Sequence, residues 1–156
     1  MRLTQYTDYG LRLLIYLAAR PDFAATVREV SDAYGISRAH LNKVALQLTS
    51  AGVLASKRGR GGGVRLAGRP DCILLGTVVR LLEPDFNLVE CMRPANACVI
   101  TPSCRLRDIC KEVQSAVLDV FDRYTLADLV HDDAQRHAIC RLLGIPAEED
   151  SLRPPL

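Results

Sequence analysis

The stretch TVREVSDAYGISRAHLNKVALQLTSAGV, residues 26–53, decides the fold of the first half of the chain. It opens with a capping box, because Thr26 and Glu29 can each satisfy an unpaired backbone N–H at the start of a helix. The pattern predicts a short helix over residues 27–34. Gly35 follows directly and can adopt the left-handed conformation that ends a helix.

A further helix is predicted after the tight turn Gly35-Ile36-Ser37, with Ser37 as its N-cap and Gly52 at its end. Its apolar residues recur at helical spacing and form one inner face: Leu41, Val44, Ala45 and Leu48. Residues 8–19 show the same spacing, and that helix ends before Pro21. Two helices joined by a tight turn, with a third before them, indicate a helix-turn-helix.

Two short strand-like runs come next, Val53–Ser56 and Val64–Leu66, joined by KRGRGGG at residues 57–63. The glycines permit a tight hairpin, and its tip carries three basic side chains, Lys57, Arg58 and Arg60. Three helices followed by a basic β-hairpin define a winged helix-turn-helix. The predicted fold is therefore mostly α, with this domain followed by a long C-terminal helix.

Polar side chains fill the first turn of the third helix: Ser37, Arg38, His40, Asn42 and Lys43. Arginine can pair with guanine and asparagine with adenine, while serine and lysine can hold phosphates. Residues 1–70 carry 11 Lys/Arg against 4 Asp/Glu, whereas residues 71–156 carry 9 against 14. The basic character of residues 1–70 favours a polyanionic binding partner such as nucleic acid. The alternative to DNA binding is a helical hairpin whose charged outer face is only solvated. The basic wing favours the interpretation that the domain binds double-stranded DNA.

The second half of the chain has a different organisation. We expect a helix over residues 73–82, closed by Pro84, and a cysteine-bearing loop over 85–103. A long helix follows over 105–124, and its apolar stripe is broad for so small a chain. The stripe favours packing against the same helix of a second subunit over packing within one subunit.

A last short helix is expected over residues 126–130, capped by Thr125, and the tail from Pro146 onward is expected to be disordered. The predicted domains are a DNA-binding domain with its connecting helix at 1–83, a metal-binding loop at 84–104, a dimerisation region at 105–131 and a partly disordered tail at 132–156.

Three cysteines lie close together in CMRPANACVITPSC, at Cys91, Cys98 and Cys104. Their spacing is C-x6-C-x5-C, and Pro94 and Pro102 keep the intervening chain out of a helix. Three soft sulfur ligands suit an iron–sulfur cluster, zinc or copper(I). Since they are one short of a tetrahedral set, the site needs a different fourth ligand or keeps an open position.

The other cysteines are expected to serve as small buried hydrophobes: Cys72, Cys110 and Cys140. Cys110 is also a second candidate ligand, because it is close in sequence to the other three. No nucleophile–base pattern stands out, so we expect no enzyme activity. No apolar run approaches the roughly 20 residues of a membrane span, and the N-terminus MRLTQYTDYG lacks the apolar h-region of a signal peptide, so we expect a cytoplasmic protein.

Several motifs together resemble a known family, the cytosolic iron–sulfur winged-helix regulators that include IscR and RirA. They are MRLTQYTDYGLRLLIYLA at the start, the wing KRGRGGGVRLA, VEC at 89–91, CVITPSCRLRDIC and YTLADLV. The resemblance covers about residues 1–130. Within the family it is strongest to the NsrR group of nitric-oxide-sensing repressors, although the first cysteine spacing is one residue longer than in some relatives.

The resemblance implies a homodimer that crosses its long helices and binds a palindromic operator. It implies an iron–sulfur cluster held by Cys91, Cys98 and Cys104, with [4Fe-4S] favoured over [2Fe-2S]. The fourth ligand would come from the N-terminal helix of the partner chain, where the matching residue is Asp8 within YTDYG. Damage to the cluster by nitric oxide would release DNA.

Three other interpretations stay open. A regulator of the same family could respond to iron or to redox state instead of nitric oxide. The same cysteines could hold a structural zinc ion without any sensing role. They could also form a thiol–disulfide switch that contains no metal.

Overall fold

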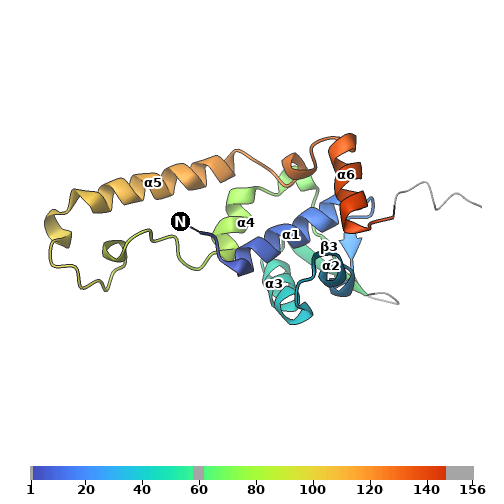
Figure 1. The fold of residues 1–156 in the computed structure, drawn as a ribbon, viewed down its shortest axis with the longest axis horizontal. Coiled ribbons are helices and arrows are strands. Elements are labelled where there is room, and N and C mark those ends of the chain that lie inside the picture. The colour runs from blue at the N-terminus through green and yellow to red at the C-terminus, as the bar shows by residue number, and fades with distance from the viewer. Residues whose placement is uncertain (1, 58–61, 147–156) are drawn as a thin grey trace, which may run out of the picture.

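The computed structural model describes residues 2–57 and 62–146. Its elements in chain order are α1 (Gln5–Ala19), β1 (Ala24–Ala25), α2 (Val27–Tyr34), α3 (Arg38–Ser50), β2 (Leu54–Lys57), β3 (Gly63–Leu66), α4 (Leu75–Leu82), α5 (Arg105–Asp122) and α6 (Asp133–Leu143), with 3₁₀ turns η1 (Pro70–Cys72), η2 (Glu90–Met92), η3 (Thr101–Ser103) and η4 (Ala127–Val130) between them. Figure 1 shows a body of helices around a small sheet, from which α5 and the cysteine loop project together. The predicted mostly helical winged-helix architecture is confirmed.

Helix α1 begins three residues earlier than predicted, because Thr4 serves as its N-cap. The Thr4 hydroxyl accepts a hydrogen bond from the backbone N–H of Thr7 at 3.3 Å. Asp8 therefore lies in the first turn of α1, near the positive end of the helix dipole. The helix ends at Ala19, and Pro21 follows.

The helix-turn-helix forms as the capping signals predict. The Thr26 hydroxyl accepts from the Glu29 N–H at 3.1 Å, and the Glu29 carboxylate accepts from the Thr26 N–H at 2.6 Å. Gly35 ends α2 at φ 64°, a conformation that would strain a residue with a side chain. Ser37 occupies the predicted N-cap position of α3, but its side chain makes no capping hydrogen bond.

The wing belongs to a three-stranded antiparallel sheet in the order β1-β3-β2. Strands β2 and β3 pair in the predicted hairpin, with Leu54 opposite Leu66 and Lys57 opposite Gly63. Strand β1 was not predicted from the sequence; its two residues pair with β3, with Ala24 opposite Arg65. Two residues are too few to show the alternation by which a strand is recognised.

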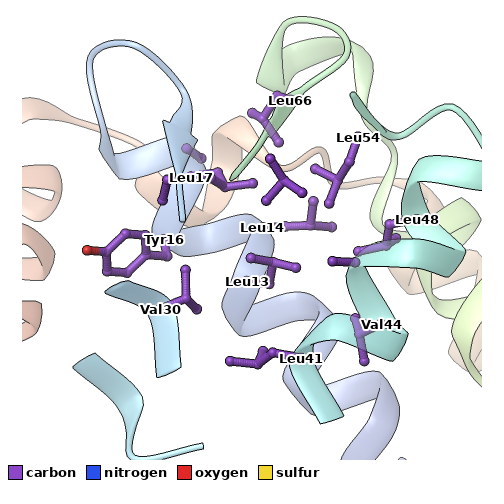
Figure 2. Close-up of a cluster of buried hydrophobic side chains, with 14 of the residues drawn as sticks. Leu13, Leu14, Tyr16, Leu17, Val30, Leu41, Val44, Leu48, Leu54 and Leu66 are labelled. Atoms are coloured by element: carbon purple, nitrogen blue, oxygen red, sulfur yellow. The ribbon is translucent and has the colours of Figure 1, made fainter. Parts of the chain in front are cut away.

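The core lies where α1 crosses α2, α3 and the sheet (Figure 2). Leu13, Leu14 and Leu17 of α1 are fully buried there, and the predicted inner face of α3 packs against them. Burying one such leucine stabilises the fold by about 1.5–3 kcal/mol. This shared core fixes the position of α3 relative to α1.

Contacts with α4 and with the residue before it hold the C-terminal end of α5 in place. An isolated β-bridge pairs Leu74 with Thr125, and Arg80 of α4 holds Asp122 at the end of α5 through two hydrogen bonds of 2.6 Å. The segment predicted as a last short helix is the 3₁₀ turn η4. Thr125 does not cap it as an acceptor, because its hydroxyl donates to Asp128 at 2.8 Å.

Helix α6 forms within residues 132–156, which were predicted to be a partly disordered tail. Asp132 caps the helix by accepting from the Gln135 N–H at 2.7 Å. The helix packs against α1, and the Cys140 thiol donates to the carbonyl oxygen of Ala19 at 3.4 Å. The rest of the predicted tail, residues 147–156, lies outside the described residues.

Candidate functional site

The N-terminal half of α3 presents the predicted DNA-contacting face. All five predicted contact residues on α3 and its cap are exposed: Ser37, Arg38, His40, Asn42 and Lys43. Among the described residues, Arg38, Asn42 and Lys43 form no side-chain hydrogen bond or ion pair within the chain. Their polar groups are therefore available to bases and phosphates, while the opposite face of α3 is buried in the core.

His40 is the one residue of this set with a partner on another element among the described residues. Its ring stacks on Tyr9 of α1, with centroids 6.2 Å apart and planes at 27°. One turn earlier in α1, the Tyr6 hydroxyl donates to the Gln47 side chain of α3 at 2.8 Å. The start of α1 therefore contacts α3, the predicted recognition helix, at two separate places.

The wing contributes a basic side chain that the structure places in an ion pair. The Lys57 ammonium lies 3.3 Å from the Asp22 carboxylate. Burial alone would raise the pKa of Asp22, but hydrogen bonds from the Ala24 N–H and from Lys57 lower it below its usual value. Lys57 thus stays beside a carboxylate in the free protein. The other two predicted contacts of the wing, Arg58 and Arg60, lie outside the described residues.

The three clustered cysteines lie on the loop between α4 and α5, and all are free thiols. Cys91 is buried in η2, whereas Cys98 and Cys104 are partly exposed. In residues 2–57 and 62–146, no three Cys, His, Asp or Glu side chains lie close enough to hold one metal ion. The single chain therefore has the predicted donors without a converged site, as expected where metal binding and loop conformation are coupled.

Local hydrogen bonds shape this loop. The Asp85 carboxylate accepts from the Asn87 N–H at 2.7 Å and from Arg93 at 2.7 Å. The Asn87 N–H in the first place, and then Arg93, hold the pKa of Asp85 below its usual value despite partial desolvation. Further along, the Thr101 hydroxyl bonds to the Asn96 side chain at 2.7 Å. These contacts fold the loop into short turns that leave three thiols at different depths.

The donor set suits an anionic iron–sulfur cluster. Three unpaired thiols are the ligands that such clusters take, and Arg107 follows Cys104 in the first turn of α5. The Nε atom of Arg107 is buried and has no hydrogen-bond partner in the described part of the chain. An unsatisfied cationic donor three residues after a candidate cysteine ligand favours a group with negative charge.

Within the described residues, Asp8 and the cysteines of its own chain form no group of three side chains that could hold a metal ion. Its carboxylate is half exposed and forms an ion pair with Arg12, one turn along α1, at 2.9 Å. A role as metal ligand therefore requires the release of Asp8 from Arg12.

The remaining cysteines divide between core and surface. Cys110 is buried on α5, and Cys140 packs partly buried against the core, as predicted for both. The prediction for Cys72 is wrong, because η1 leaves this thiol exposed. Among the apolar residues that follow Cys72, Leu75 is buried and Ile73 partly buried, whereas Leu74 is exposed like Cys72 itself.

The fold and the exposed face of α3 define a class of protein, the winged-helix DNA-binding regulators of transcription. The chain belongs to the Rrf2 family, described as iron-dependent transcriptional regulators, whose sequence profile matches residues 3–132. The HTH-type transcriptional regulator NsrR of Bacillus subtilis is 48% identical over 132 residues, covering 83% of this chain and 90% of the relative. The resemblance to the NsrR group is thereby confirmed.

Solved structures agree with this assignment. A transcriptional regulator from Listeria innocua superposes with a TM-score of 0.68 at 31% identity, covering 85% of this chain and 88% of that one. The cysteine regulator CymR of B. subtilis gives 0.67 at 26% identity, covering 84% and 97%. Within the described residues no helix is both long and apolar enough to cross a membrane.

Proposed function

We propose that this chain is a transcriptional repressor whose DNA binding is controlled by an iron–sulfur cluster that senses nitric oxide. The observation that carries the proposal is the combination of two features in one Rrf2 chain. Three free thiols occupy one loop, and the helix that carries the exposed polar face, α3, is in direct contact with α1. A cluster at the loop and DNA at α3 would therefore communicate through α1.

The DNA-binding unit is a two-fold dimer on a palindromic operator, with one α3 helix in the major groove of each half-site. The half-exposed apolar stripe of α5 supports the dimer, since its members lie along one side of the helix: Leu106, Ile109, Val113 and Val120. Asp8 is consistent with a dimer as well, since within the described residues it does not join the cysteines of its own chain in a group that could hold a metal ion.

The proposed ligands are Cys91, Cys98 and Cys104, with Asp8 of the second subunit as the fourth. When bound, the cluster supplies iron that nitric oxide or oxygen can attack, first at the position held by the harder, weaker carboxylate. Losing that ligand frees the first turn of α1 to re-form the Asp8–Arg12 ion pair. Because α1 contacts α3, the change reaches the recognition helix.

A second function has support of its own. The family profile is described as that of iron-dependent regulators, so a response to iron supply through the same cysteines is the alternative. In that case the presence or absence of the cluster, rather than its attack by nitric oxide, sets the affinity for DNA.

Anaerobic purification followed by counting iron, sulfide and zinc per chain tests the metal. A cluster gives iron and acid-labile sulfide in equal amounts, a structural site gives zinc alone, and a thiol switch gives neither. Replacing any one of Cys91, Cys98 and Cys104 by serine should abolish the cluster. The controls Cys72→Ser and Cys140→Ser should retain it, and full retention in any of the first three variants contradicts the ligand set.

The signal is tested on the intact holo protein with operator DNA. Nitric oxide should lower the affinity at constant total iron, whereas an iron chelator should act slowly or not at all. If the chelator lowers the affinity for DNA more readily than nitric oxide does, the result supports iron sensing.

A further inference from the structure

A buried glutamate joins the base of the cysteine loop to the start of α1. Glu83 follows α4 directly, one residue before the loop begins at Pro84, and only 7% of it is exposed. Carboxylates are almost never buried without partners, because moving the charge out of water is costly. The partners of Glu83 therefore indicate what holds this junction together.

All three donors to Glu83 in the described part of the chain belong to the first turn of α1 and its cap. The Oε2 atom of Glu83 accepts from the Thr4 N–H at 2.9 Å, from the Thr4 hydroxyl at 3.0 Å and from the Thr7 hydroxyl at 2.6 Å. Within the described residues no Lys or Arg forms an ion pair with Glu83. The charge is therefore compensated by three neutral donors and by the positive end of the α1 dipole.

The same junction is also bonded to the recognition helix. Two residues before Glu83, the carbonyl oxygen of Leu81 accepts from the Gln47 side chain of α3 at 2.7 Å. The side-chain oxygen of the same Gln47 amide accepts a hydrogen bond from the Tyr6 hydroxyl of α1. Residues 81–83 thus hold α3 and the first turn of α1 at once, through hydrogen bonds that have defined lengths and directions.

Close packing makes the junction stiff. Gly10 faces α4, and a Cβ atom at this position would overlap Cδ1 of Leu82. Helices α1 and α4 therefore approach more closely than a larger residue would allow. A displacement at the loop base moves the start of α1 instead of being absorbed by loose side chains.

We propose that Glu83 is the positioning residue that transmits the state of a subunit's own cysteine loop to its own α1 and α3. The inference rests on the proposed function and deepens it. Asp8 would link α1 to the cluster of the other subunit, whereas Glu83 links α1 to the loop of the same subunit. With both links in place, a change at either cluster reaches the recognition helix.

The test is the ratio of operator affinity between holo and apo protein, measured in wild type and in Glu83→Gln. Glutamine keeps the shape of the side chain and removes its charge. Allosteric coupling between two sites commonly amounts to about 5- to 150-fold in affinity. We expect the holo-to-apo ratio to fall by about fivefold or more, with iron and sulfide per chain unchanged. Glu112→Gln is the matched control, since Glu112 lies exposed on α5.

Thr7 provides a second variant that does not depend on the glutamate. Thr7→Val removes the 2.6 Å hydrogen bond at constant shape and should lower the holo-to-apo affinity ratio. Thr7→Ser keeps the hydroxyl and should leave this ratio as in wild type. In apo protein, the amides of residues 4–8 should exchange hydrogen faster in Glu83→Gln and in Thr7→Val than in wild type or Thr7→Ser.

Three results would decide the question. A reduced ratio in both disruptive variants, with full cluster content and a normal ratio in Thr7→Ser and Glu112→Gln, supports the inference. An unchanged ratio in Glu83→Gln and Thr7→Val at full cluster content overturns it, while the proposed function stands. Equal affinity of holo and apo wild type overturns the proposed function itself.

Discussion

Replacing Ile109 by alanine tests whether α5 packs against a second subunit. This side chain lies within the apolar stripe of α5 and is 47% exposed in the single chain. Alanine is a better helix former than isoleucine, so an effect on assembly would not come from loss of the helix.

The magnitude follows from the exposed half of the side chain. Burying a whole isoleucine side chain is worth about 1.5–3 kcal/mol, so covering the exposed half adds about 1 kcal/mol in each subunit. Two-fold symmetry places the change on both sides of the interface, and the dimer loses about 2 kcal/mol. The dissociation constant of the dimer should then rise about 30-fold.

Sedimentation equilibrium over a range of protein concentrations measures this constant. Leu142→Ala is the control, because Leu142 lies on α6 and is 81% exposed. It should leave the constant within about twofold of wild type. An interface on α5 is contradicted if the dimer of Ile109→Ala has the same dissociation constant as wild type. It is also contradicted if Ile109→Ala and Leu142→Ala raise this constant equally.

The remaining predictions concern the fourth ligand and the wing. Asp8→Ala should keep part of the cluster, because three thiolates remain, but change its spectrum and its reactivity with nitric oxide; if the spectrum and the holo-to-apo affinity ratio both match wild type, Asp8 only complements the helix dipole. Alanine in place of Lys57, Arg58 and Arg60 should flatten the dependence of log affinity on log salt, by about 0.9 for each phosphate group that these side chains neutralise. An unchanged slope would show that they do not touch phosphate.

Local signals explain why the DNA-binding half was predictable. The capping box at Thr26 and the left-handed Gly35 act within one turn of the chain, so sequence alone reveals them. The inner face of α3 follows from helical spacing in the same way. Strand β1 escaped prediction because it exists only through its pairing with β3.

Tertiary packing explains the differences in the second half. Helix α6 is held by contact with α1 and by the Asp132 cap. Cys72 was predicted buried from its apolar neighbours, but a 3₁₀ turn directs it outward. The outward direction of Cys72 does not follow from a local pattern.

The candidate metal site was predictable as a set of donors and not as a geometry. Spacing identifies the three thiols, and the structure confirms that they are free on one loop. Their convergence depends on the metal and, for Asp8, on another subunit, and neither is encoded in the conformation of one chain. Glu83 carried no sequence signal, since its importance comes from donors that are more than 70 residues away.

Helix α1 has the mechanical form of a lever. Its far end is fixed, because α6 bonds to Ala19 and the leucines nearby are fully buried, while its near end carries Asp8 and the Glu83 contacts. The helix is about 22 Å long, so a shift of about 2 Å at its start amounts to a tilt of about 5° around Ala19. Tyr9 would then move by about 1.4 Å. The first turn of α3 would follow Tyr9, whereas the sheet beside the fixed end would stay in place. The output of such a lever is a change in the angle between recognition helix and wing.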